Sequence, residues 1–384
     1  MKPFPDRDRD RPKRPARLVV RVAVGLGVLG GAAWIALACS DDPHRRTSAE
    51  QALGGGGACA AAPGHLPPPD CDNSDNSRCV PDQGCTINEA RCGSKSTCLP
   101  IGDNKGKDVL DFRIRRLKIA TPAALAGDFI QNNIVTLNID LAEKSCGEPG
   151  KGLFTWLLQV DKKNNTLITG GAPPSTDAIG KGFCFARFDI GTTKVAPFTS
   201  KIAFTGDTFR SLEPQKVKIP IFTDTGGVIL LPLTDVQVEG VTISDDGNCI
   251  GKINPAALDS NCADGADCTK WKTAGALGGF ISLEEADGVK IELLGKSLCA
   301  FFTGDPIKCA RDPQGKILFQ GDFCSSDKQP GSCADSMWLA ATFAASSVKI
   351  FDGKDTVPNC SGAVTAVDAG PDSGPDAADA ADGG

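Results

Sequence analysis

The distribution of apolar and polar residues changes near residue 106, and beyond that point it is typical of short β-strands. Ile134–Leu141 alternates apolar and polar residues with a period of two, which predicts a strand with one buried face. Leu153–Val160 and Thr166–Ile168, separated by the polar run Lys162–Asn165, predict a hairpin. Further strands are expected around Phe112, Ile114 and Leu117, and over Phe183–Ile190, Lys201–Phe204, Val217–Phe222, Val228–Leu231, Val236–Ile243, Ile317–Phe319 and Met337–Phe343.

A single helical pattern interrupts these strands, from about 282 to 300. Ser282 and Glu285 fit a capping box, and Leu283, Ala286 and Leu293 follow at roughly helical spacing. We expect this helix to pack on a sheet. Because no series of amphipathic helices alternates with the strands, residues 106–362 are predicted to form a mainly β, sandwich-like antiparallel body.

The N-terminal residues 1–38 have the organisation of an export signal. A basic, proline-rich stretch precedes the uncharged run Val22–Ala38, which ends at Cys39. Leu37-Ala38-Cys39 resembles the lipobox of bacterial lipoproteins, in which the cysteine becomes the lipidated first residue, and Ser40 after it resembles a signal for sorting to the outer membrane. Cleavage of the same bond by an ordinary signal peptidase and an uncleaved anchor helix are the alternatives. In all three cases the rest of the chain is exported to an oxidising space.

Two low-complexity segments flank the regions that can fold. Residues 39–58 contain a run of four glycines and cannot bury a core, so they are predicted to form a flexible tether. Residues 363–384 consist mainly of Asp, Ala, Gly and Pro, which predicts a disordered, solvated tail.

The 17 cysteines divide into one, six and ten. Cys39 is assigned to the lipid. The six others near the N-terminus lie within residues 59–105, a polar segment too short to hold a shape without covalent closure, and predict a small disulfide-rich module. The ten in the body predict up to five disulfides, and no Cys-x-x-Cys pair indicates zinc or thioredoxin-like chemistry. The module set is Cys59, Cys71, Cys79, Cys85, Cys92 and Cys98; the body set is Cys146, Cys184, Cys249, Cys262, Cys268, Cys299, Cys309, Cys324, Cys333 and Cys360.

Composition narrows the chemistry. The two histidines, His44 and His65, both precede the body, which argues against a catalytic triad, a His general base or a His-ligated zinc site. The body is modestly acidic without a basic stripe, which argues against nucleic acid as a partner. We expect no cofactor and no metal.

Two weaker hypotheses rest on acidic residues. Glu284, Glu285 and Asp287 could serve a carboxylate-dependent hydrolase, although neighbouring acids in a first helical turn are more typical of a solvated surface. Asp70–Asp75 and Asp245–Asn248 offer oxygen ligands for calcium, but neither has the spacing of a twelve-residue calcium loop.

Tryptophan offers the only candidate for a binding surface. Trp156 and Trp338 lie in strand patterns and are expected in the core. Trp271, between Lys270 and Lys272, is expected to be partly exposed and is a weak candidate for ligand binding.

The lipobox-like start, the tether, the cysteine-rich module and the Asp-Ala-Gly-Pro tail together resemble uncharacterised surface lipoproteins of myxobacteria and their relatives. The specific resemblance covers the signal and the low-complexity ends, and it implies a location but no activity. We therefore expect a non-enzymatic outer-membrane lipoprotein, held by its N-terminal lipid and facing the periplasm or the cell surface. Its role is expected to be structural or the binding of an unidentified surface or extracellular ligand. The alternatives are the hydrolase and a calcium-dependent adhesin.

Overall fold

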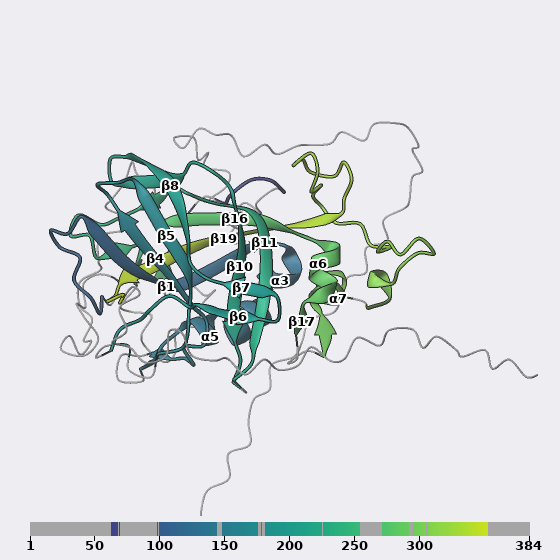
Figure 1. Ribbon diagram of the computed structural model, residues 1–384, viewed down its shortest axis with the longest axis horizontal. Coiled ribbons are helices and arrows are strands. Elements are labelled where there is room, and N and C mark those ends of the chain that lie inside the picture. Colours follow the sequence, from purple (N-terminus) through teal and green to yellow (C-terminus); the bar gives the residue numbers. More distant parts are fainter. Residues whose placement is uncertain are drawn as a thin grey trace, which may run out of the picture. The chain divides into compact units, whose positions relative to one another are not determined.

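The computed structural model describes residues 63–67, 69, 98 and 100–351, except 144–147, 176–177, 179–180, 225, 254–270, 292–294 and 305. One antiparallel sheet of eleven strands dominates this part of the chain (Figure 1). In sheet order the strands are β10 (Gln215–Phe222), β11 (Val228–Glu239), β16 (Gly275–Ser282), β19 (Ser336–Ser347), β1 (Val109–Thr121), β4 (Thr155–Asp161), β5 (Thr166–Ala172), β8 (Phe198–Thr205), β9 (Thr208–Ser211) and β12 (Val241–Thr242), while β13 (Cys249–Ile250) pairs with β19.

The sheet curls until strands far apart in its order meet. Val238 of β11 donates its backbone N–H to the Ser211 hydroxyl of β9 at 3.0 Å, and that hydroxyl lies 3.2 Å from the Val238 carbonyl. The mainly β, antiparallel body predicted from the sequence is confirmed, and its facing layers belong to one curled sheet. The predicted hairpin is confirmed as β4 and β5, with Asn165 at a positive φ of 52° in the turn.

The alternating apolar residues of the strands fill the interior of the curl. Phe112 and Ile114 of β1 pack with Leu158 of β4 and Phe343 of β19, all buried. Trp156 and Trp338 are 9% and 5% exposed, so both lie in the core as predicted.

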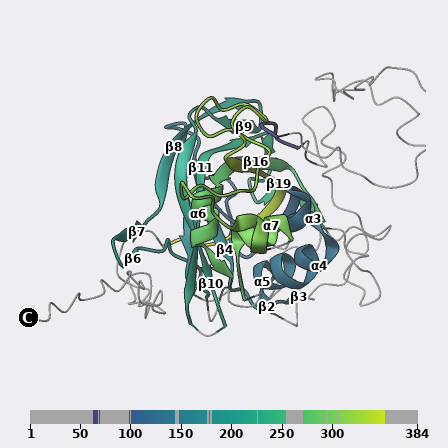
Figure 2. The same cartoon turned by 90° about the vertical axis from the view of Figure 1, so that its right-hand side faces the viewer.

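The remaining elements are short. Figure 2 shows the helices gathered at one end of the sheet. None of the described helices is both long enough and apolar enough to span a bilayer. The helical segments are α3 (Ala123–Ala126), α4 (Asp128–Ile130), the π-helix η2 (Gln131–Thr136), α5 (Leu137–Ile139), α6 (Leu283–Gly288), α7 (Leu298–Thr303) and the 3₁₀-helix η6 (Pro306–Cys309). The small two-stranded sheets pair β2 (Ala142–Glu143) with β3 (Glu148–Pro149), β6 (Phe188–Ile190) with β7 (Thr193–Val195), β14 (Lys252–Ile253) with β15 (Trp271–Lys272), and β17 (Lys290–Ile291) with β18 (Lys296–Ser297).

The strand predicted over Ile134–Leu141 is wrong, because most of this segment is helical, in η2 and α5. Its polar side chains satisfy backbone groups within the segment: the Thr136 hydroxyl donates to the Gln131 carbonyl, and the Asn138 amide donates to the Ile134 carbonyl. The Gln131 side chain in turn accepts from the Ile119 N–H and donates to the Leu117 carbonyl of β1. A period-two pattern therefore folds as a helix here, in a segment that the Gln131 side chain ties to β1.

The single helix predicted over 282–300 is also wrong. The capping box is confirmed, since the Ser282 hydroxyl accepts from the Glu285 N–H at 3.2 Å, but α6 ends at Gly288. The hairpin of β17 and β18 follows, and α7 begins after its own cap, Ser297. Gly295, with a φ of 60°, lies next to this hairpin, in a conformation that glycine adopts without strain.

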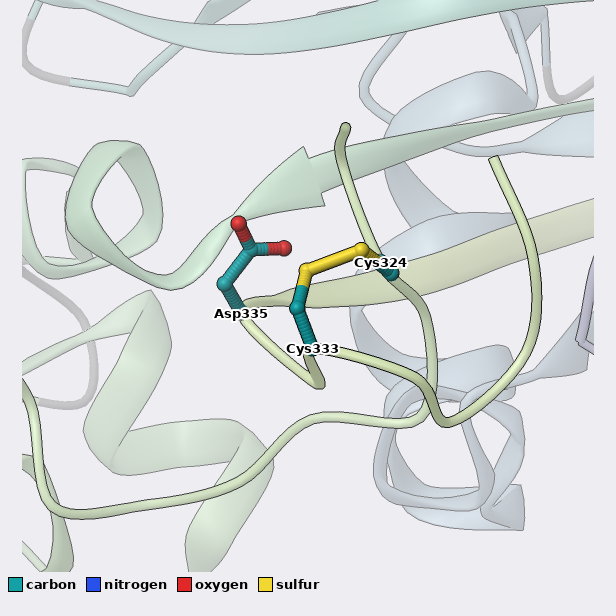
Figure 3. Close-up of side chains that lie close together, drawn as sticks. All are labelled: Cys324, Cys333 and Asp335. Carbon is teal, nitrogen blue, oxygen red and sulfur yellow. A yellow bond between two sulfur atoms is a disulfide. The ribbon is translucent and has the colours of Figure 1, made fainter. Parts of the chain in front are cut away.

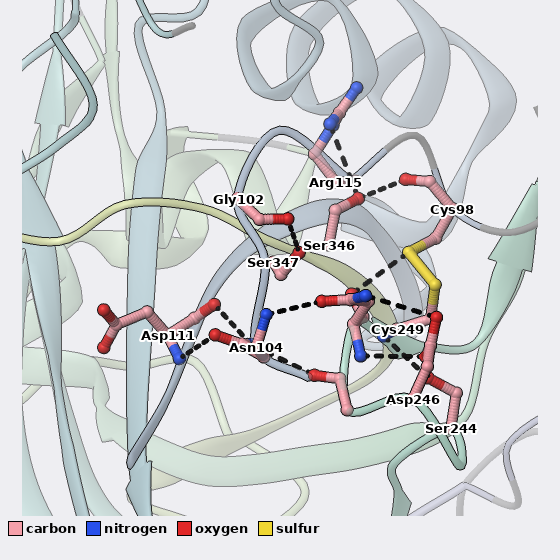
Figure 4. The surroundings of a disulfide bond; sticks show 12 residues. Cys98, Gly102, Asn104, Asp111, Arg115, Ser244, Asp246, Cys249, Ser346 and Ser347 are labelled. Carbon is pink, nitrogen blue, oxygen red and sulfur yellow. Dashed lines mark hydrogen bonds between the residues drawn. A yellow bond between two sulfur atoms is a disulfide. The ribbon is translucent and has the colours of Figure 1, made fainter. Parts of the chain in front are cut away.

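A long-range disulfide overturns the division of the cysteines into two self-contained sets. Cys98, assigned to the module, is bonded to Cys249 of the body (Figure 4). This bond takes one cysteine from each set, so that five remain in the module set and nine in the body set. Both numbers are odd, although the sixteen cysteines together are even in number. Residues after Cys98 continue onto the body, because the Ile101 and Gly102 N–H groups both donate to the Ser347 carbonyl. Spacing in the sequence could not reveal a partner 151 residues away.

Residues 63–67, assigned to the same module, also lie against the body. Trp338 donates its indole N–H to the His65 carbonyl at 3.0 Å, and Leu66 packs with Phe280 and Phe323. The predicted signal, tether and tail lie outside the described residues, as do Cys39, Cys59, Cys71, Cys79, Cys85, Cys92, Cys146, Cys262, Cys268, Cys360, His44 and Asp70–Asp75.

Candidate functional site

Trp271 is not the exposed binding residue that the sequence predicted. Its side chain is 1% exposed and packs with Cys98, Cys249 and Ala344. The Arg115 guanidinium lies over the ring, 5.7 Å from its centroid. The Cys98–Cys249 disulfide and the pairing of β15 with β14 create this core, and neither can be inferred from the lysines that flank the tryptophan.

The body disulfides resolved besides Cys98–Cys249 are local. Cys299 is bonded to Cys309 and Cys324 to Cys333, each across about ten residues. Cys184 is also disulfide-bonded. The two local bonds close the loops around α7 and before β19.

The acidic cluster on α6 is a surface ion-pair network. Arg311 binds Glu284 and also Asp287, with Nη2 lying 3.3 Å from the latter's carboxylate, and both pairs are exposed. The Glu285 carboxylate accepts a hydrogen bond from the Lys216 ammonium at 3.0 Å. Partial burial raises the pKa of Glu285, but hydrogen bonds from Lys216 and Ser282 outweigh it and hold that pKa below its usual value. Each carboxylate therefore faces a cation or a cap, an arrangement unlike the facing acid and base of a glycoside hydrolase.

The Asp245–Asn248 loop is a hydrogen-bonded turn. Asp246 accepts from the Ser244 hydroxyl at 2.6 Å and from the Asn248 N–H at 3.0 Å. Asn248 in turn accepts from the Asn104 N–H (Figure 4). Partial burial raises the pKa of Asp246, but the hydrogen bonds from Ser244 and Asn248 outweigh this effect and hold the pKa below its usual value. The Asp246 and Asn248 oxygens of this turn therefore bind protein donors, and Asn248 connects the turn to the segment before β1.

A second group of metal-ligating residue types gathers before β19, where Asp335 lies beside Cys324 and Cys333 (Figure 3). The two sulfurs are bonded to each other, so they are not thiolate ligands. Asp335 accepts hydrogen bonds from the Ser325 N–H and hydroxyl at 2.8 and 2.7 Å. This cluster is a structural loop.

An apolar cavity of about 240 Å³, partly open to solvent, lies between the sheet and the helices and could accept a ligand. Strands β10 and β11 supply one wall through side chains at alternating positions, such as Ile219 and Ile221, or Ile229 and Leu231. Polar neighbours, such as Lys218, point to the other face of β10, as the strand period requires.

Helical segments form the opposite walls of this cavity. Ile130, Ile134 and Val135 come from α4 and η2, while Leu298 and Phe301 come from α7. The two segments whose secondary structure was predicted wrongly, Ile134–Leu141 and residues 282–300, thus both contribute walls to this cavity. Their apolar residues were visible in the sequence, but their convergence was not.

The lining of the cavity determines what it can hold. Apart from Thr121 and Asn138, every lining residue that the structure describes is apolar, and none is charged. The Asn138 amide nitrogen donates to the Ile134 carbonyl at 2.7 Å, while its buried Oδ1 accepts no hydrogen bond from the described residues. The cavity therefore offers no acid, base or nucleophile for catalysis, and a hydrocarbon group is the ligand that its surface matches.

Comparison with known proteins adds no relative: no family model, curated protein or solved structure matches this chain.

Proposed function

We propose that this protein is an exported, lipid-anchored binding protein whose body encloses a hydrocarbon chain of an apolar or amphipathic ligand. The observation that carries the proposal is the apolar cavity of about 240 Å³ between the sheet and the helices. It exceeds the ~150 Å³ of an engineered cavity that binds benzene and approaches the ~300 Å³ at which drug-sized pockets begin.

The surface of the cavity supports a ligand of this kind. Its lining is almost entirely apolar, so a hydrocarbon chain that enters it removes apolar surface from water, which is favourable by about 25 cal/mol per Å².

Export and anchoring are supported from the sequence and from the bonds. The basic and apolar start precedes Cys39, and the sixteen other cysteines are even in number. Disulfides persist in oxidising compartments such as the periplasm and the cell surface. Mass spectrometry of the intact protein from its own membrane, before and after reduction and alkylation, measures the N-terminal lipid and the free thiols together. A mass that shows Cys39 without a lipid would refute the proposed lipid anchor.

The binding function is tested with decanoate, measured by calorimetric titration of the purified mature chain. The variant Ile229→Trp places a bulky side chain in the cavity, and Leu212→Trp makes the same change at an exposed residue outside it. We expect Ile229→Trp to weaken decanoate binding by at least about tenfold. Each methylene that is displaced from the cavity lowers the affinity roughly fourfold, and the larger side chain should displace at least two. Leu212→Trp is expected to bind as the wild type does. Equal binding by both variants, or no binding by the wild type, would overturn the proposal.

A further inference from the structure

We infer that five side chains at the inner end of the cavity determine the length of the hydrocarbon chain that the protein holds. This inference rests on the proposed binding function. A second, smaller cavity of about 70 Å³ lies inside the curled sheet. The two cavities share Leu117, Phe154, Ile219, Leu233 and Leu277, which we call the neck. The larger cavity is the outer chamber and the smaller one the inner chamber.

The inner chamber is suited to the methyl end of a chain. Its surface consists almost entirely of apolar atoms. The Thr169 hydroxyl donates to the Leu157 carbonyl at 2.7 Å, and the Ser200 hydroxyl to the Lys201 carbonyl at 3.3 Å. The lining also contains Ser211, Gln215 and Gln237, but none of its residues is charged. Because the Thr169 and Ser200 hydroxyls already bind backbone carbonyls and most of the surface is apolar, the chamber favours a hydrocarbon tail over a charged head group.

The volumes give a scale for the chain length. If a methylene takes roughly the ~30 Å³ share of a water molecule, the outer chamber holds on the order of eight methylenes and the inner chamber about two more. The closed neck thus ends the chain at the outer chamber, and opening it adds the inner one.

Leu277 is the neck residue best placed for a test. It lies on β16, where its backbone partners are Ala341 of β19 and Val238 of β11, and its side chain lines both chambers. Leu339, on the adjacent strand β19, is partly buried like Leu277 but lines only the outer chamber. Leu277→Ala and Leu339→Ala therefore remove the same atoms, and only the former opens the neck.

The experiment measures the affinity of the full-length mature chain for straight-chain alkanoates from hexanoate to hexadecanoate. In the wild type we expect about fourfold tighter binding per added methylene until the outer chamber is full, and a plateau beyond that length. The plateau should move to longer chains in both variants, and about two carbons further in Leu277→Ala than in Leu339→Ala.

A substitution that fills the inner chamber separates its contribution from that of the removed leucine. Ser200→Leu should shorten the plateau length of Leu277→Ala and leave those of Leu339→Ala and the wild type unchanged; if this variant does not fold, Thr169→Leu fills the same chamber. Equal plateau lengths for the two leucine variants, or no effect of filling the chamber, would overturn the inference while leaving the proposed function intact. Absence of binding at every chain length would instead refute the proposed function.

Discussion

The Cys98–Cys249 disulfide joins the segment before β1 to β13, and its contribution to stability can be separated from that of an ordinary local bond. It closes a loop with a sequence separation of 151, whereas Cys299–Cys309 closes one of 10. All four cysteines are buried, so replacing either pair by alanine removes similar packing. The two double variants therefore differ chiefly in the loop that is opened.

The magnitude follows from the entropy of loop closure. The chain-entropy relation gives about 5 kcal/mol for the long loop and about 2.7 kcal/mol for the short one at 25 °C. We therefore expect Cys98→Ala/Cys249→Ala to lose roughly 2.4 kcal/mol more free energy of unfolding than Cys299→Ala/Cys309→Ala. The long-range bond also fixes the neighbourhood of Trp271, so its loss should change the fluorescence of the native state.

Guanidinium unfolding of the full chain, followed by tryptophan fluorescence, measures both variants against the wild type. The slope of each transition shows whether the comparison is between similar denatured states. Equal losses in the two variants, or a larger loss for the short loop, would refute the loop-closure reasoning.

Two further predictions concern single residues. A Cβ at Gly321 would lie 1.9 Å from the Ser336 carbonyl oxygen, so Gly321→Ala should lower the free energy of unfolding by at least about 2 kcal/mol, while Gly288→Ala, with open space around it, should change it by less than about 0.5 kcal/mol. Calorimetric melting of both variants checks this, and similar melting temperatures would contradict it. Asp246→Ala should cost about 1 kcal/mol at neutral pH, because the turn loses hydrogen bonds to a carboxylate that is partly exposed. Since the pKa of Asp246 is lowered in the folded state, its contribution is present above the unfolded pKa of about 4 and is lost as the pH falls through the lower folded value. The gap between the unfolding free energies of wild type and variant should therefore narrow as the pH is lowered, and a gap that does not depend on pH would disprove the assignment.

Local patterns predicted the strands best where the alternation agreed with a hairpin turn. The β4–β5 pair and the capping box at Ser282 were correctly placed because their signals involve residues close in sequence. Ile134–Leu141 shows the limit of the same reasoning. Its alternation is as clear as that of a strand, yet the segment is helical and is tied to β1 through Gln131, a contact between residues that the alternation does not encode.

The candidate site was the part that sequence reasoning missed. Ile219 and Leu231 lie in segments that were predicted to be strands, and Leu298 in a segment predicted to be helical. A buried face gives the same pattern whether it packs against other side chains or borders a cavity. The prediction that Trp271 is partly exposed was wrong for a related reason, since the residue packs against a disulfide between two distant cysteines.

The sequence by itself determined the β-rich, antiparallel character of the body and the expectation of export with disulfides. These properties depend on residue periodicity, turn residues, composition and the order of charged and apolar segments, all of which are local. Tertiary structure alone decided that the sheet curls, that Cys98 reaches Cys249, and that helices at its end leave an apolar cavity. Those features arise from contacts between residues far apart in the chain, where the pairing of strands and the volumes of opposing side chains, rather than any local pattern, set the outcome.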